Sequence, residues 1–78
     1  MNTFLVEAVK FVGRMVLGTG VLEQIKDAVD EWSTKQISGL DKKEGVISQL
    51  KADGLIMTQR AFDNGIQLAL IWIDLESK

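Results

Sequence analysis

Residues 15–25 read MVLGTGVLEQI, and this stretch sets two glycines within a repeating apolar pattern. The pattern starts at Phe4 and runs in alternating steps of four and three residues, which keeps its members on one face of a helix. Its positions are Phe4, Ala8, Phe11, Met15, Gly18, Leu22, Ile25, Val29 and Trp32. Each glycine costs about 1 kcal/mol relative to alanine inside a helix. We therefore predict either a break, where Gly18 ends one helix and Thr19 or Gly20 caps the next, or glycines that let another helix pack closely.

A second apolar stripe widens the apolar face in the first half of this segment. It consists of Leu5, Val9, Val12 and Val16, whereas Glu7, Lys10 and Arg14 lie on the opposite side. The second half is narrowly amphipathic, with its acidic residues toward solvent. The sequence thus predicts a long amphipathic helix over residues 1–33, with the break, if it forms, at 18–20.

A loop at residues 33–39 (STKQISG) separates this segment from a second helix. Asp41 is the expected N-cap of that helix, because Glu44 follows it at the spacing of a capping box. Gly54 is expected to end the helix, since glycine after a helical run adopts the left-handed conformation without strain.

The remaining residues predict one more helix after a short apolar connector at 55–57. Thr58 is well placed to cap it, and its apolar pattern continues to about Glu76. Residues 41–76 therefore form a predicted helical hairpin packed on the first segment. The fold class that we expect is all-α, a single domain over residues 1–78 built as a small bundle of three to four helices.

The final helix contains GIQLALIWID at residues 65–74, which is more apolar than one buried stripe requires. Some of its side chains suit the internal core: Ile66, Ala69, Leu70 and Ile73. The remaining side chains point largely elsewhere, and either the two flanking helices or a partner covers them: Leu68, Ile71, Trp72 and Leu75. Together with apolar residues of the first helix, they give a predicted interface of Phe4, Phe11, Met15, Leu68, Ile71, Trp72 and Leu75. Each of these residues has a plain core role as its alternative.

The composition removes most catalytic classes. The chain has no Cys and no His, so the usual nucleophile–base pairs and zinc sites cannot be assembled. Asp27, Asp30 and Glu31 lack the pattern of a calcium loop and are interpreted as a solvated acidic face. We expect no enzyme activity, no catalytic residues, no cofactor and no metal. Stability is expected to be marginal, because so short a chain buries a smaller fraction of its surface on folding than a larger domain does.

Charge bears on the expected partners and location. The net charge of −2 argues against nucleic-acid binding, which requires a basic face. Residues 42–73 nevertheless have the order of helix, short glycine-containing turn and helix that is found in a helix-turn-helix motif. Glu7, Lys10 and Arg14 interrupt the N-terminal apolar run, so we do not expect that run to span a membrane. We expect a protein of the bacterial host cytoplasm or of a phage particle, with contact at a membrane surface as the alternative.

The C-terminal half resembles the soluble helical segment of phage holins of the LLH type (holin superfamily six). The resemblance spans about Ala28 to Ile73 and is carried by Ala28-Val29, Asp41-Lys42-Lys43-Glu44, Val46, Leu50, Gly54 and Ile66-Gln67-Leu68-Ala69-Leu70. It implies a phage or prophage origin and a helical oligomerising module, and the family name implies pore formation. The chain departs from the family at Gln67, where Glu is usual, and in its charged N-terminal helix, where a transmembrane segment is expected.

These observations predict a small phage-type helical protein that works by self-association or by helix-mediated binding to another protein. Two alternatives stay open at this point. One is a peripheral membrane or holin-like lysis protein that uses the apolar face of the first helix. The other is a helix-turn-helix regulator.

Overall fold

The computed structural model describes residues 3–77, and this part of the chain contains four helices and no strand. The helices are α1 (Thr3–Leu17), α2 (Val21–Ser33), α3 (Gly39–Ala52) and α4 (Gln59–Glu76). The predicted all-α fold is therefore confirmed. The first two residues of the predicted first helix, and the last residue of the domain, lie outside the described part.

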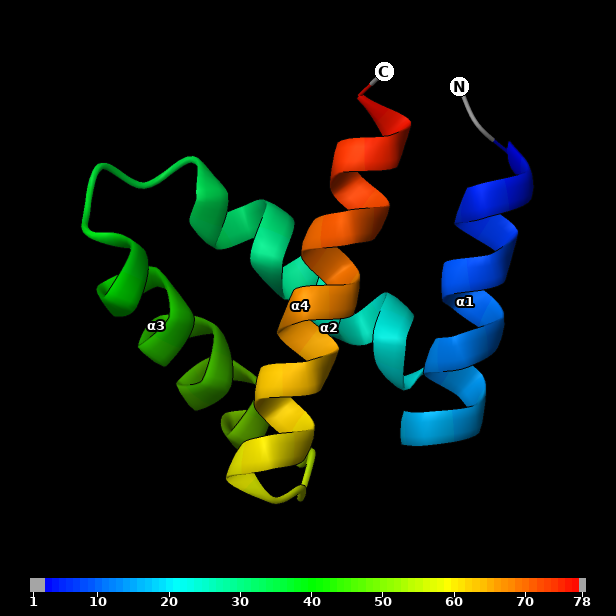
Figure 1. Ribbon diagram of the computed structural model, residues 1–78. Helices are drawn as coiled ribbons and strands as arrows, with labels where there is room; N and C mark the ends of the chain where they lie inside the picture. The colour runs from blue at the N-terminus through cyan, green and yellow to red at the C-terminus, as the bar shows by residue number, and fades with distance from the viewer. Residues whose placement is uncertain (1–2, 78) are drawn as a thin grey trace.

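Helix α2 is the element on which the others pack. It crosses behind α4, and it contacts α1, α3 and α4 (Figure 1). α1 and α4 lie side by side and run in opposite directions. α3 and α4 form the predicted pair joined by a short connector, but they diverge from that connector: α3 packs against α2, and α4 packs against both α2 and α1.

The predicted break at 18–20 is confirmed, and glycine conformation explains it. Gly18 and Gly20 have φ angles of 106° and 81°, a region that residues with a side chain rarely adopt. The Gly18 N–H donates to the Arg14 carbonyl at 3.1 Å and closes α1. Gly20 is the N-cap of α2. The chain can therefore turn sharply between two helices that share one apolar pattern.

The start of α3 differs from the prediction. Ser38, not Asp41, is the N-cap, and its Oγ accepts a hydrogen bond from the Asp41 N–H at 3.1 Å. Ser38 precedes Asp41 by the same three residues that separate Asp41 from Glu44, so the sequence holds two capping signals in succession. The earlier one is used, because it lengthens the helix by three residues and leaves the Asp41 carboxylate in the first turn, where the helix dipole favours it.

The other predicted helix ends are confirmed. Thr58 caps α4, and its Oγ1 accepts from the Ala61 N–H at 3.1 Å. Gly54, with a φ angle of 95°, follows the end of α3. The N–H of the next residue, Leu55, donates to the Leu50 carbonyl at 3.0 Å, which is the hydrogen bond of a Schellman cap.

The core lies where α2, α3 and α4 meet, and α1 adds little to it. Its buried apolar residues are Val6, Leu22, Ile25, Ala28, Val29, Val46, Ile47, Leu50, Phe62, Ile66, Ala69 and Trp72. Leu70, which the sequence assigned to the core, is about half exposed, because α4 turns this side toward the gap that opens between α3 and α4. Trp72 is only 6% exposed, so the structure gives it the core role that was the alternative to its predicted place in the interface.

Three glycines let the other helices approach α2 closely. A methyl group added at Gly13 of α1 would lie 2.5 Å from Cδ2 of Leu22. One added at Gly65 of α4 would lie 2.5 Å from Cδ1 of Ile25. The third contact is between Gly45 of α3 and the ring of Trp32, where the added methyl would lie 2.6 Å from Cε3. Each helix therefore presents bare backbone to a large side chain of α2.

We predict that Gly13→Ala lowers the free energy of unfolding. The added methyl also meets Leu22 Cβ at 2.9 Å, an atom held close to the backbone, so the helices must move apart. Overpacking of this kind costs about 1–3 kcal/mol, and the better helix propensity of alanine returns about 1 kcal/mol. The expected net loss is about 1 kcal/mol, which lowers Tm by about 4–8 °C in a domain of this size.

Gly39→Ala is the matched control, because nothing lies within 4 Å of a methyl group at this position in the first turn of α3. Thermal unfolding followed by circular dichroism should separate the two variants. An equal or higher Tm for the Gly13 variant than for the Gly39 variant would contradict the close contact between α1 and α2.

Candidate interaction surface

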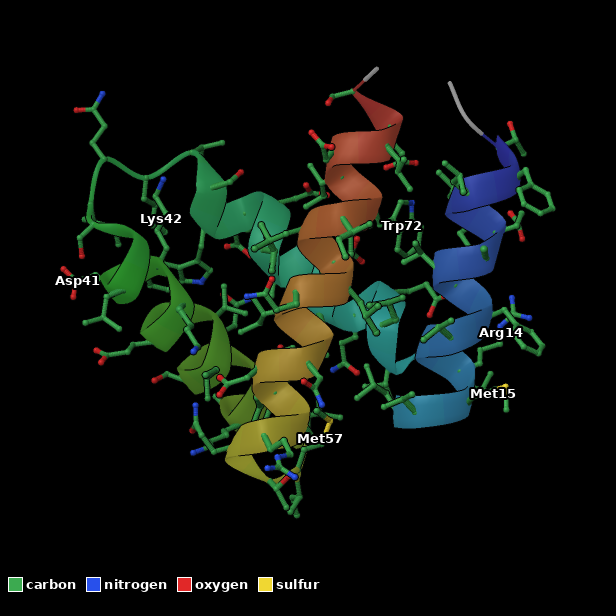
Figure 2. The ribbon with its side chains drawn as sticks, viewed as in Figure 1. Arg14, Met15, Asp41, Lys42, Met57 and Trp72 are labelled. Carbon is green, nitrogen blue, oxygen red and sulfur yellow. The ribbon has the colours of Figure 1, made fainter. Side chains whose placement is uncertain are left out.

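The outer side of α1 carries an uncovered apolar stripe. Val6 and Gly13 are the buried residues of this helix. Phe4, Phe11 and Met15 lie on the opposite side, with exposed fractions of 80%, 60% and 72%. Figure 2 shows Met15 and Arg14 projecting from α1 away from the rest of the molecule. Ala8 is also exposed and fills the stripe at helical spacing, and we call these four residues, Phe4, Ala8, Phe11 and Met15, the α1 face.

The turn at 18–20 explains why this stripe faces outward. The same pattern of four and three steps continues through α2, where Leu22, Ile25 and Val29 are buried. Because the chain changes direction at Gly18 and Gly20, the pattern that faces the core in α2 faces solvent in α1. α1 meets the core with the narrow strip around Val6 and Gly13 instead.

A shallow apolar groove adjoins the α1 face, between α1 and α4. It has a volume of about 270 Å³ and is lined by Leu5, Ala8, Val9, Val12, Leu68, Ile71 and Leu75. We call it the α1–α4 groove. Ile71 is about half exposed, whereas Leu68 and Leu75 are partly buried. The face and the groove share Ala8 and together form one continuous apolar surface.

This surface brings together six of the seven residues predicted for the interface. Phe4, Phe11 and Met15 belong to the α1 face, and Leu68, Ile71 and Leu75 line the groove. The seventh, Trp72, lies beneath the surface between α4 and α1 (Figure 2). The sequence analysis did not include Leu5 and Val12 in the interface, although both belong to the second apolar stripe that it identified.

Two lysines hold Trp72 in place below the surface. The Nζ atoms of Lys10 and Lys26 lie 4.9 Å and 5.0 Å from the centroid of the Trp72 ring, within the range of cation–π attraction. Lys26 also forms ion pairs of 3.1 Å with Asp30 and with Glu76 at the end of α4. Lys10 is therefore drawn inward from the polar side of α1, which leaves that side with less exposed positive charge.

The polar edge of the α1 face carries one acidic and one basic residue. Glu7 is more than half exposed and forms a 3.5 Å ion pair with Lys10. Arg14 is exposed, and within residues 3–77 its guanidinium takes part in no ion pair. These two charges lie seven residues apart, on the same side of the helix.

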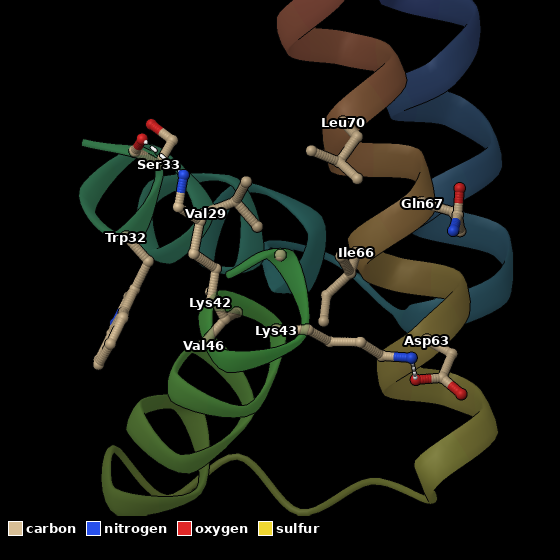
Figure 3. Close-up of a pocket in the computed structure, with 11 residues that line it drawn as sticks. Val29, Trp32, Ser33, Lys42, Lys43, Val46, Asp63, Ile66, Gln67 and Leu70 are labelled. Atoms are coloured by element: carbon tan, nitrogen blue, oxygen red, sulfur yellow. Dashed lines mark hydrogen bonds and ion pairs between the residues drawn. The ribbon is translucent and has the colours of Figure 1, made fainter. Parts of the chain in front are cut away.

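A second groove lies between α3 and α4, over α2 (Figure 3). It has a volume of about 330 Å³, and its apolar lining comes from Val29, Trp32, Val46, Ile66 and Leu70. Lys43 of α3 reaches across to Asp63 of α4 at 2.8 Å, as the dashed line in Figure 3 shows. This ion pair ties the two diverging helices together.

The sequence analysis did not predict the groove between α3 and α4. No local signal in the sequence marks it, since residues of α3 and α4 such as Val46 and Leu70 line one groove only because both helices rest on α2.

Several kinds of site have no support in the described part of the chain. Between residues 3 and 77, no helix combines the length and apolar character needed to cross a bilayer. No three acidic side chains in that range gather closely enough to hold a metal ion. Comparison of the chain with protein-family models, curated proteins and solved structures finds no match.

We predict that the Lys43–Asp63 pair makes stability depend on pH. The hydrogen bond from Lys43 holds the pKa of Asp63 below its ordinary value of 3.8. The folded state therefore favours the ionised carboxylate, and the resulting stability is present above pH 3.8 and is lost as the pH falls through the lower folded pKa. Asp63→Asn should lower the urea midpoint at pH 7, and its difference from the parent should shrink below pH 3.8.

Glu44→Gln is the control, because Glu44 is an exposed carboxylate of α3 that takes part in no ion pair among the described residues. Its urea midpoint should follow that of the parent at pH 7. A gap between the Asp63 variant and the parent that stays constant down to pH 2.5 would show that the ion pair does not contribute.

Proposed function

We propose that this chain is a small phage or prophage-type protein that acts through self-association, and that its contact surface is the α1 face with the α1–α4 groove. The observation that supports this most is the position of Phe4, Phe11 and Met15, which are mostly exposed on the side of α1 opposite the core. The resemblance to the soluble segment of LLH-type holins supports the phage origin and an oligomerising role.

Energetics favour a covered surface. Burying a side chain such as Phe or Met contributes about 1.5–3 kcal/mol. A partner that covers the three exposed side chains Phe4, Phe11 and Met15 therefore stabilises the complex by several kcal/mol. A domain this small keeps little stability of its own, so a gain of that size matters. Large aromatic and Met side chains are also the residues that interface centres favour.

A protein surface fits α1 better than a lipid surface does. Helices that lie on anionic membranes carry several Lys and Arg residues along their polar side. On α1 that side consists of Glu7, Lys10 and Arg14, and Lys10 is drawn toward Trp72. With one acidic residue beside one exposed basic residue, electrostatic attraction to anionic lipid is weak.

The proposal is tested by comparing the self-association of the parent with that of a variant that carries a charged residue in the α1 face. Sedimentation velocity over about 1 to 500 μM should show a concentration-dependent shift to a larger species. Phe11→Glu should weaken the association at least about tenfold, because it replaces about 1.5–3 kcal/mol of apolar burial with a charge. Ile56→Glu is the matched control, since Ile56 is 94% exposed in the connector before α4 and lies outside the surface.

A monomer at every concentration would contradict the proposal, as would equal effects of the two substitutions. Binding of the monomer to anionic vesicles, lost in the Phe11 variant, would instead assign the surface to a membrane.

A further inference from the structure

The α1 face has a spacing that reads the same in both directions. Its residues Phe4, Ala8, Phe11 and Met15 are separated by steps of four, three and four. In a heptad labelled a to g, they occupy positions d, a, d and a. If a second α1 runs in the opposite direction, each a position meets a d position. Phe4 then lies opposite Met15 of the second copy, and Ala8 lies opposite Phe11 of the second copy.

This arrangement balances the sizes of the side chains. Each inner layer pairs the small Ala8 with the large Phe11, and each outer layer pairs Phe4 with Met15. A parallel pair would set Phe11 against Phe11 and Ala8 against Ala8, so a crowded layer would follow an empty one. Close-packed interfaces disfavour such voids, because atoms that line a gap lose their contacts.

The charges beside the stripe fit the same arrangement. Glu7 and Arg14 both occupy g positions, and in an antiparallel pair g residues lie beside g residues. Glu7 of each copy therefore lies beside Arg14 of the other, and two opposite-charge pairs form. In the parallel pair, g lies beside e, and Glu7 would meet Val12. Glu7 and Arg14 are both exposed on α1, so their side chains can reach a neighbouring helix.

From the stripe, the side-chain sizes and the charges, we infer that the partner of the α1 face is a second copy of this chain, docked through α1 in an antiparallel, two-fold symmetric pair. This inference rests on the proposed self-association and specifies its geometry. Leu5 and Val12 occupy e positions, so in the pair they lie together above the α1–α4 groove. The core does not occupy this face, because Val6 and Gly13, the buried residues of α1, lie on the opposite side of the helix.

A charge-exchange cycle tests the pairing. Glu7→Arg and Arg14→Glu each place like charges beside each other at both of the contacts between positions 7 and 14, so each should raise the dimer Kd by about tenfold. The double variant Glu7→Arg with Arg14→Glu restores opposite charges and should return Kd to within about threefold of the parent value. High salt should reduce the effect of the single variants. Circular dichroism of each variant checks that it is folded.

A distance measurement tests the direction. The chain has no cysteine, so Thr3→Cys carries a single spin label. In the antiparallel pair Thr3 is level with residue 16 of the second copy, which separates the two Thr3 positions by about 20 Å along the axis at 1.5 Å per residue. In a parallel pair the two Thr3 positions would be at the same level, separated by little more than the distance of about 8–10 Å between the helix axes.

The outcomes separate this inference from the proposed function. A dimer with a short Thr3 distance, or one whose Kd the double variant does not restore, overturns the antiparallel pairing and leaves self-association in place. A monomer at all concentrations overturns both. A long Thr3 distance together with recovery in the double variant supports the pairing.

Discussion

The close approach of three helices to α2 is the constraint on which the rest of the structure depends. α1, α3 and α4 each bring a glycine against a large side chain of α2, at Leu22, Trp32 and Ile25. The contacts are distributed along α2, so this short helix of thirteen residues organises the whole core. Leu22 and Ile25 of α2 are fully buried together with Leu50 of α3 and Phe62 of α4, whereas α1 contributes Val6 to this core.

The outward stripe of α1 follows from this arrangement. α1 rests on its neighbours through Val6 and Gly13, with Val9 and Leu17 packed beside them, and the glycine turn at 18–20 directs the Phe4, Phe11 and Met15 stripe away from the core. A sequence that continues one apolar pattern through two helices thus serves two purposes. The α2 half builds the core, and the α1 half remains available for a partner. The ion pairs of Lys26 and Lys43 then fix α4 to α2 and α3 without using the α1 face.

Local chemistry made much of the fold predictable from the sequence. The glycine break, the Thr58 cap and the Gly54 stop each depend on residues within one turn of the event. The prediction of Asp41 as the N-cap of α3 was wrong, because Ser38 and Asp41 offer the same capping signal. Which of the two residues caps the helix depends on which start gives the longer helix. Phe4, Phe11 and Met15, three of the residues predicted for an interface, are exposed, whereas Trp72 is in the core, and the interface itself stays a prediction. Helical period shows which residues share a face, but not whether that face meets the core, since this depends on the direction of the neighbouring helix.

The central claim is that one apolar surface, the α1 face with the α1–α4 groove, is where this chain meets its partner. The most direct measurement is a dilution series of ¹H–¹⁵N correlation spectra, in which each amide reports on its own surroundings. The account predicts concentration-dependent shifts in α1 and in the part of α4 around Ile71, with little change in α3 and in the connector at 53–58. Shifts that centre on the groove between α3 and α4, or spectra that do not change with concentration, would contradict it.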